Sequence, residues 1–364
     1  MTPLAQGFAA LRPAVDLATA DALDETISSF ADPCSPTEIF SAARTAAAGG
    51  KRFRGLLAHL GRSLVSGAPI DRFPVGPLSA ALELYQASAL VHDDLIDHSP
   101  TRRSLPTPHV ALARIHSDRG WTGDDREFGS SAALLVGDLL FSAAERAVAR
   151  SCADLAPAAA SRLLLAYSRM HAEVAYGQYL DLRAEQLPLD PSDDEAISTT
   201  TADEVNLHKS ARYSIVHPTL LGAIAAGADD ALLGDLESIL TPWGLAFQMR
   251  DDDLGVFGDP DLTGKPAGGD IREGKRTALL AIAWAEATRA EREALASALG
   301  RADLDDVRLE EARSVIDQRA RAAHEGLIDA LVDRGRRALD SSRLDEAARA
   351  VLAELAEIVV VRRA

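Results

Sequence analysis

Two groups of aspartates are the residues in this chain best suited to chemistry. Asp93, Asp94 and Asp97 form a D-D-x-x-D pattern, and a second run, Asp251–Asp253, follows much later. Each group sits inside an apolar, alanine- and leucine-rich stretch that reads as helix. Carboxylates this close repel one another, and their burial without a counter-charge is costly. Because Mg²⁺ is commonly held by one or two carboxylates together with substrate phosphates, the pattern indicates diphosphate chemistry.

The spacing of the first group suits a shared cation. In a helix Asp93 and Asp97 lie on one face, about one turn (~5.4 Å) apart, whereas Asp94 points roughly 100° away and would act through bound water. A solvated acidic face is the alternative reading of this pattern taken alone. Arg102 and Arg103 follow closely, and guanidinium groups bind phosphate oxygens bidentately at any relevant pH. Carboxylates, metal and paired arginines together predict a diphosphate clamp.

Cations beside glycines recur at two further places. Lys51, Arg52 and Arg54 follow the pair Gly49–Gly50, just before a helical segment at 56–64, where backbone amides and cationic side chains favour an anion. A basic surface turn is the alternative there. After the second aspartate run, lysines again stand in glycine-rich stretches, at Lys265 and Lys275. The order of acid followed by base predicts two facing helices that share one diphosphate.

Length and composition limit the class of protein. The chain has 364 residues, 5% aromatic residues and a formal net charge of −17. The balance of residues favours helix over sheet, and the acidity argues against nonspecific binding to nucleic acid or anionic membranes. Two cysteines, Cys34 and Cys152, fit a reducing cytoplasm and a role as small buried hydrophobes. We expect a cytoplasmic protein with no secretory signal and no transmembrane segment, because apolar runs fall short of about 20 residues.

Helical periodicity runs through nearly the whole chain, and no stretch resembles a linker between domains. We therefore predict one all-α domain over residues 1–364, a large helical bundle with a central cavity lined by the two aspartate-rich helices. Turn-rich composition predicts the main loops. These are 67–76, 98–108, 118–130, 186–201 and 258–274.

Seven motifs occur in an order that resembles the trans-isoprenyl diphosphate synthases, or polyprenyl synthetases. The resemblance runs from about Gly49 to Thr277, and its joint pattern is far more specific than any one motif. The motifs are GGKRFRG, HDDLIDHSPTRR, VGDLL, GQYLDL, HKSARYS, FQMRDDDLGVFGD and TGKPAGGDIREGKRT. The resemblance implies an isoprenoid-synthase type of helical bundle, most similar in kind to geranylgeranyl diphosphate synthases.

The resemblance also implies roles for individual residues. Three Mg²⁺ ions would be bound, with the allylic diphosphate, by the first motif and from the opposite helix by the second. The implied metal residues are Asp93, Asp94, Asp97, Asp251 and Asp252. Isopentenyl diphosphate would bind Lys51, Arg54 and Arg103, and Arg102 would contact the allylic diphosphate. Lys209, Gln248 and Lys265 would steady the departing diphosphate and the allylic cation, and Lys275 would help at the rim.

The chain departs from the family pattern at several positions. Gln86 replaces a histidine that often binds isopentenyl diphosphate, and its amide can still donate a hydrogen bond. Ser210 replaces a threonine and keeps the hydroxyl. The second motif has Gly255 in place of its last aspartate and gains Asp253, which we interpret as a change in the water shell around the metal.

The implied reaction is Mg²⁺-dependent head-to-tail elongation of an allylic diphosphate by isopentenyl diphosphate. The product would grow along the helix of Asp93, past residues earlier in sequence. Ser88 and Ala89 lie about 6 to 7.5 Å deeper than Asp93, and Tyr85 about 12 Å deeper. Ser88 and Ala89 are small and leave room for a growing chain, whereas the larger Tyr85 would stop further growth. We therefore predict all-trans geranylgeranyl diphosphate as the product. The alternative is that Tyr85 points elsewhere and other helices set the length, giving a farnesyl or longer polyprenyl product.

Two other functions remain as alternatives at this point. A class I terpene cyclase also ionises a prenyl diphosphate with an aspartate-rich helix and Mg²⁺, but it needs no second diphosphate site such as Lys51, Arg54 and Arg103 predict. A noncatalytic partner of another synthase would commonly lose one acidic motif, and both are present here. Family resemblance suggests a homodimer whose partners are the two diphosphate substrates and no nucleic acid.

Overall fold

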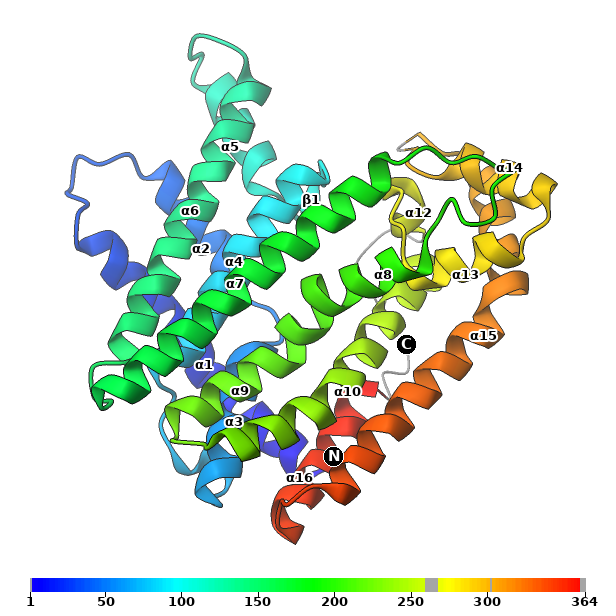
Figure 1. Ribbon diagram of the computed structural model, residues 1–364. Coiled ribbons are helices and arrows are strands. Elements are labelled where there is room, and N and C mark those ends of the chain that lie inside the picture. Colours follow the sequence, from blue (N-terminus) through cyan, green and yellow to red (C-terminus); the bar gives the residue numbers. More distant parts are fainter. Residues whose placement is uncertain (1, 259–267, 302, 361–364) are drawn as a thin grey trace. The chain divides into compact units, whose positions relative to one another are not determined.

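A computed structural model describes residues 2–258, 268–301 and 303–360, and these are helical almost throughout (Figure 1). The prediction of an all-α fold is confirmed. The chain forms two compact units, one of Met1–Leu165 with Pro218–Ala228 and the other of Ala166–His217 with Asp229–Ala364. Two helices run from one unit into the other, α7 (Pro157–Gln186) and α9 (His217–Ala225).

The first unit is built around α4, the helix of the first aspartate motif. Its described elements, besides the first part of α7 and most of α9, are α1 (Pro3–Ser28), α2 (Glu38–Ala47), α3 (Phe53–Ser66), the 3₁₀ turn η1 (Ile70–Arg72), α4 (Pro77–Ile96), β1 (Thr101–Arg102), β2 (Leu105–Pro106), α5 (Pro108–Asp118) and α6 (Asp125–Ser151). Helices α1, α2, α3 and α6 all pack on α4, and α5 packs on α6. The run from Leu78 to Tyr85 is buried on every side, as expected of a helix at the centre of a bundle.

Close helix contacts in this unit depend on glycine. A Cβ on Gly61 of α3 would stand 2.0 Å from the carbonyl oxygen of Thr219, and one on Gly222 of α9 would stand 1.9 Å from that of Ala58. The two backbones therefore meet with no side chain between them, and any larger residue would push the helices apart.

The second unit is built around α10, the helix of the second aspartate run. Its described elements, besides the second part of α7, are α8 (Thr199–Val205), the π-helix η2 (Asn206–Val216), α10 (Asp230–Phe257), α12 (Gly269–Glu273), α13 (Ala278–Glu286), α14 (Arg289–Ala298), α15 (Asp306–Ser341) and α16 (Glu346–Val360). Helix α10 packs on η2, α15, α16 and α12. Trp243 is fully buried there, donates to the Val332 carbonyl at 3.3 Å and covers Gly335, where a Cβ would meet its ring at 2.2 Å.

Side-chain caps explain where many helices begin. The carboxylates of Asp124, Asp229 and Asp305 accept from backbone amides in the first turns of α6, α10 and α15. Thr288 and Glu291 form a reciprocal capping box at α14. These residues satisfy amides that the helix leaves unpaired and place acids at the positive end of the helix dipole.

Helix breaks lie within four of the predicted loops, but those at 118–130 and 186–201 were predicted too long, because α6 begins at Asp125 and α8 at Thr199. Residues 259–267 of the fifth predicted loop lie outside the described residues. Three of the predicted loops contain short elements. The segment 67–76 holds η1, the segment 98–108 holds the β1–β2 hairpin, and 258–274 holds α12. Strands β1 and β2 pair antiparallel with Thr101 opposite Pro106. This hairpin matters because it begins just after the end of α4 and holds Arg102 close to Asp94 of that helix.

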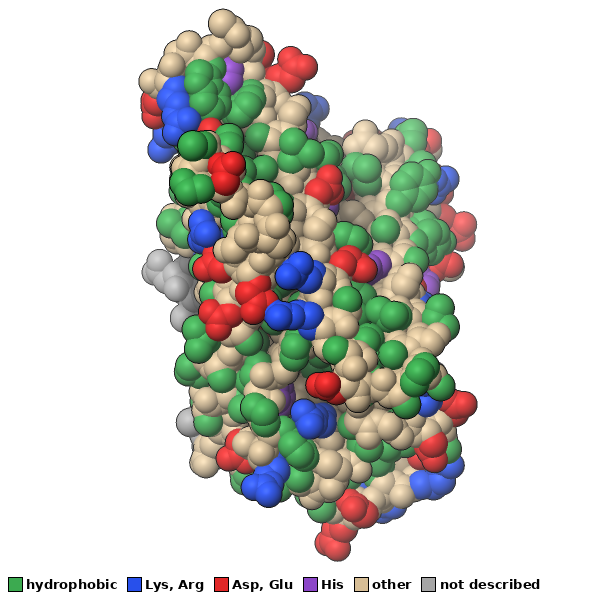
Figure 2. All heavy atoms as spheres, turned by 90° about the vertical axis from the view of Figure 1, so that its left-hand side faces the viewer, with side chains coloured by type: hydrophobic (Ala, Val, Ile, Leu, Met, Phe, Trp, Pro, Cys, Tyr) green, Lys and Arg blue, Asp and Glu red, His purple; other side chains and the backbone are tan. Residues whose placement is uncertain are grey.

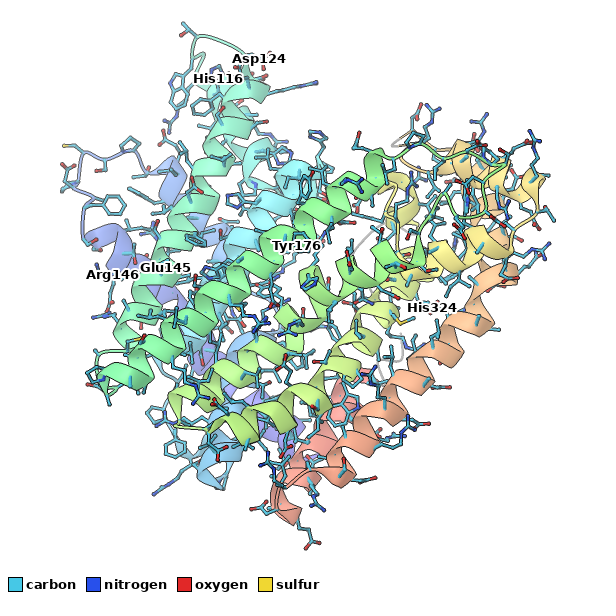
Figure 3. All side chains as sticks on the ribbon, viewed as in Figure 1. His116, Asp124, Glu145, Arg146, Tyr176 and His324 are labelled. Carbon is cyan, nitrogen blue, oxygen red and sulfur yellow. The ribbon has the colours of Figure 1, made fainter. Side chains whose placement is uncertain are left out.

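The surface in Figure 2 mixes acidic, basic and hydrophobic side chains rather than gathering them by kind. At its upper end the turn between α5 and α6 forms a tip, where His116 and Asp124 lie (Figure 3). The His116 ring packs against Trp121 and Phe128, with ring centroids 5.8 and 5.1 Å away. In the described part of the chain, every helix is too short or too polar to span a bilayer.

Candidate active site

The first aspartate motif closes α4. Asp97 is the C-cap residue, and its amide donates to the Asp93 carbonyl at 2.8 Å. Asp93 and Asp97 are partly exposed, as are Gln86 and Ala89, and together they form one stripe along the helix. Carboxylates at a helix C-terminus lie at the negative end of the helix dipole, so this end of α4 attracts cations.

Asp94 has a different environment from its two neighbours. Its side chain is buried, with 2% of the residue exposed, and Arg102 Nε donates to both of its oxygens at 2.8 Å. Burial raises the pKa of Asp94, and the guanidinium of Arg102 opposes that rise. Arg102 Nη2 also lies 3.5 Å from Asp93 Oδ2. Asp94 therefore anchors Arg102 beside the motif, and its predicted help to a metal stays a prediction.

The cationic turn before α3 lies beside Arg103. Arg103 Nη1 donates to the Ala48 carbonyl at 2.7 Å, and a Cβ on Gly50 would stand 2.6 Å from Nη2 of the same guanidinium. Gly49 and Gly50 have φ of 69° and 96°, a backbone region that suits glycine. The structure thus brings Arg103 to the turn that carries Lys51 and Arg54, as the sequence predicted for one diphosphate site.

Arg52, in the middle of this turn, is structural. It is buried, its Nε contacts Asp16 Oδ1 at 2.5 Å and its Nη2 donates to the Ala47 carbonyl at 2.8 Å. Glu83 of α4 lies 3.7 Å from Arg52 and also accepts from the Gly55 amide at 2.8 Å. Sequence reasoning missed Glu83, although a lone carboxylate in the apolar run of α4 was a usable signal.

The three residues predicted to set product length occupy two faces of α4. Tyr85 and Ser88 are buried, with 6% and 1% exposed, and the Tyr85 ring meets Phe141 of α6 edge-on with centroids 6.0 Å apart. Burial raises the pKa of the Tyr85 hydroxyl. Ala89 is partly exposed on the stripe of Asp93. Of the three, Ala89 is therefore the residue that shares a face with the predicted metal ligands.

The second aspartate run lies near the end of α10. Asp252 is buried and accepts from Gln248 Nε2, one turn earlier, at 2.8 Å. Burial raises the pKa of Asp252 well above its usual range, and the neighbouring carboxylates Asp270, Asp251 and Asp181 add to that rise. Such a concentration of carboxylates suits a divalent cation, whose charge would relieve the repulsion. Gln248 therefore contacts the motif directly, and its predicted role toward the diphosphate and the allylic cation stays a prediction.

The two departures in this motif have separate structural explanations. A Cβ on Gly255 would stand 2.0 Å from Asp270 Oδ2, so the carboxylate of Asp270 from α12 occupies the space where an aspartate side chain at 255 would begin. Asp253 instead turns toward α15, with Oδ1 4.0 Å from Arg321 Nε. Arg250 and Glu325 form a second link between α10 and α15, at 2.5 and 2.8 Å.

Lys209 and Ser210 lie on the π-helix η2, and Lys209 Nζ donates to Asp181 of α7 at 2.6 Å. Lys275 also reaches Asp181, at 3.4 Å, and contacts Glu185 at 2.8 Å. The third predicted lysine, Lys265, lies outside the described residues. Sequence reasoning quoted the motif of Asp181 but assigned that residue no role.

The predicted site residues are divided between the two compact units. The first motif with its arginines belongs to one unit and the second motif with Lys209 and Lys275 to the other, so the predicted facing of the two helices and their shared cavity remain predictions. Within the described residues no three His, Cys, Asp or Glu side chains are arranged to hold a metal by themselves. Magnesium held jointly by carboxylates and phosphates does not require such a cage.

Known proteins are similar to this chain in both sequence and structure. The family model described as polyprenyl synthetase matches residues 37–316. A short chain isoprenyl diphosphate synthase of Methanothermobacter thermautotrophicus is 34% identical over 70% of this chain and 70% of its own length. A geranylgeranyl diphosphate synthase of Saccharolobus solfataricus is 31% identical over 74% and 73%. The crystal structure of geranylgeranyl pyrophosphate synthase from Corynebacterium glutamicum, complexed with isoprenyl diphosphate and magnesium, is 35% identical, with a TM-score of 0.86 over 96% of this chain and 98% of that one.

Proposed function

The chain belongs to the polyprenyl synthetase family and is a prenyltransferase, and from this premise we propose that it joins isopentenyl diphosphate to an allylic diphosphate in head-to-tail chain elongation. The observation that carries the proposal is the pairing of carboxylates and cations in the first unit. Arg102 lies 3.5 Å from Asp93 and donates to Asp94, while Arg103 lies against the turn that begins with Gly49–Gly50 and continues to Lys51 and Arg54. Two anion sites side by side suit two diphosphates, whereas ionisation of a single diphosphate needs only one.

Asp93, Asp97 and Asp251 are the proposed metal ligands, with Asp252 beside Asp251. Their fit to Mg²⁺ rests on the helix end that carries the first two and on the carboxylate repulsion around Asp252. When bound, Mg²⁺ supplies Lewis-acid stabilisation of the charge that develops on the departing diphosphate. We propose three ions per site, a number that a metal titration would check.

The chain's own residues do the remaining work. Arg102, held rigidly by Asp94, orients the allylic diphosphate as its C–O bond breaks. Arg103 with Lys51 and Arg54 positions isopentenyl diphosphate, so that its double bond meets the allylic cation before water does. Loss of a proton to the released diphosphate completes the step, and no protein nucleophile is required.

We propose geranylgeranyl diphosphate as the product. Ala89 supports this assignment because its small side chain lies one turn before Asp93 on the partly exposed stripe of α4. The relatives from Saccharolobus and Corynebacterium bear the names of geranylgeranyl synthases. Tyr85, packed on Phe141, is then part of the wall between α4 and α6 at greater depth.

Product analysis tests both levels of this proposal. The protein is incubated with Mg²⁺, isopentenyl diphosphate and each of dimethylallyl, geranyl and farnesyl diphosphate, and chain length is read by mass spectrometry. We expect a twenty-carbon product from all three primers. Ala89→Phe is expected to shorten the product, whereas Ser88→Phe, at a position only 1% exposed, mainly lowers stability. No condensation with any primer would refute the function, and an unchanged product from Ala89→Phe would refute the depth argument.

We also propose that the two units act as one synthase domain, because the family match runs across both. A cytoplasmic homodimer that binds no nucleic acid is the assembly we propose. Its expected mass by size-exclusion chromatography with light scattering is twice that of the 38.6 kDa chain.

A further inference from the structure

The G-Q-Y-L-D-L motif of α7 places one carboxylate between two ammonium groups. Asp181 Oδ2 accepts from Lys209 Nζ at 2.6 Å and from Lys275 Nζ at 3.4 Å, and its side chain is 8% exposed. Glu185, one turn later on the same face, lies 2.8 Å from Lys275. Asp181 is therefore the carboxylate that the two lysines share.

The same face of α7 also holds the backbone of Lys209. Gly177 lies one turn before Asp181, and a Cβ there would stand 2.3 Å from the Lys209 nitrogen and 2.7 Å from its Cα. Helix α7 thus contacts Lys209 at both ends, at the main chain through Gly177 and at the ammonium group through Asp181. Lys209 itself sits in an eleven-residue π-helix, a rare geometry that is frequent at functional sites.

This arrangement has two opposing effects on an incoming diphosphate. An ammonium group is a strongly hydrated charge on a flexible stem, and a buried carboxylate restricts where that charge can go. The same carboxylate competes with phosphate oxygens for the ammonium group and repels the anion. It also adds to the negative charge around Asp252. A group with both effects would weaken binding of the anion while improving its placement.

We propose that Asp181 is a positioning residue, which holds the ammonium groups of Lys209 and Lys275 together in the diphosphate-free protein and sets the place from which they reach the departing diphosphate. The inference rests on the proposed function for the identity of the reaction. It requires only that the two lysines bind a diphosphate, and that requirement can be measured without turnover.

The test compares binding and catalysis in Asp181→Asn. This change keeps the shape of the side chain and removes its charge. We expect inorganic pyrophosphate, titrated calorimetrically at a fixed Mg²⁺ concentration, to bind about tenfold more tightly. We expect kcat for condensation to fall about ten- to a hundredfold, because the ammonium groups lose their fixed position. If Asp181 only supported the fold, its replacement would not make pyrophosphate bind more tightly and at the same time lower kcat.

Three further variants make the outcome decisive. Asp181→Glu keeps the charge and is expected to bind pyrophosphate like the unmodified protein, which also keeps the test valid if Asp181→Asn folds poorly. Glu185→Gln, the matched control, removes a carboxylate that contacts Lys275, and it is expected to tighten binding less than Asp181→Asn. In a Lys209→Met background the effect of Asp181→Asn on pyrophosphate binding is expected to shrink severalfold.

Unchanged or weaker pyrophosphate binding in folded Asp181→Asn would overturn the inference, as would tighter binding in Asp181→Glu. If the proposed function were wrong, the experiments would give a different result. The unmodified protein would then show no condensation with any primer, while the binding differences among these variants would still be measurable.

Discussion

Restoring an aspartate at position 255 should destabilise the metal-free protein, although it matches the usual motif more closely. The Cβ of any residue at 255 meets Asp270 Oδ2 at 2.0 Å and Oδ1 at 2.6 Å, so the Asp270 carboxylate has to move. Asp252 lies one turn before Gly255, and the charge of Asp270 already raises its pKa. Gly255→Asp therefore adds a third carboxylate to a pair that already repels.

The expected magnitude separates into a steric and an electrostatic part. Crowding at a packed position costs about 1–3 kcal/mol, and replacing a helical glycine by Asp or Asn recovers only about 0.3 kcal/mol. Two like charges ~4 Å apart repel by roughly 4 kcal/mol at an effective dielectric constant of about 20. Because position 255 is partly exposed, solvent screening reduces this to about 2 kcal/mol. Gly255→Asn carries the steric part alone, so the two variants should differ by about 2 kcal/mol.

The assay is thermal and urea unfolding of Gly255→Asp and Gly255→Asn at neutral pH, low salt and with a chelator. Gly255→Asp should unfold a few degrees lower than Gly255→Asn. The difference should shrink in 1 M salt, where the screening length falls to about 3 Å, and also on addition of Mg²⁺. Equal stability of the two variants under chelation would refute the reasoning, because Asp270 and Asp252 would then not act on position 255.

Other parts of the site make separate predictions. Asp93→Ala should abolish condensation, measured with labelled isopentenyl diphosphate, while the far-UV circular dichroism spectrum stays unchanged; residual turnover above about 1% would contradict its role as a metal ligand. Gly50→Ala should raise KM for isopentenyl diphosphate about tenfold with a smaller change for the allylic substrate, because its Cβ would displace the Arg103 guanidinium, and equal effects on both KM values would count against this site. His324 is 1% exposed and burial lowers its pKa to about 4, so the unfolded chain takes up the proton first and stability should fall by up to about 3 kcal/mol as pH drops from 6.5 toward 4. Urea unfolding at pH 7 and pH 5 should show a smaller loss in His324→Gln than in the unmodified protein, and an equal loss would exclude this histidine as the cause.

Much of the helical architecture could be predicted from the sequence. Period and composition predicted an all-helical chain, and the places of the loops followed from Gly, Pro and Asp clusters, because these preferences are local. The grouping of Arg103 with the turn of Lys51 and Arg54 was also expected, and the hydrogen bond from Arg103 to the Ala48 carbonyl now gives it a geometric basis.

The pairing of side chains from distant segments could not be predicted from the sequence. The attachment of Asp94 to Arg102 depends on the short β1–β2 hairpin, and the turn of Asp253 toward Arg321 depends on how α10 packs on α15. Neither arrangement follows from spacing along a single helix, since residues of the same type at adjacent positions point in different directions.

The sequence alone determined the kind of protein, because the joint order of its acidic and basic motifs predicted a prenyl diphosphate synthase and the polyprenyl synthetase model matches residues 37–316. Only the tertiary structure decided which of those charges are committed to one another: Asp94 to Arg102, Arg52 to Asp16, and Asp181 to Lys209. The physical reason is that a charge pair forms where packing brings two segments within hydrogen-bonding distance, and that distance is set by contacts such as Gly177 against η2, which no local pattern encodes.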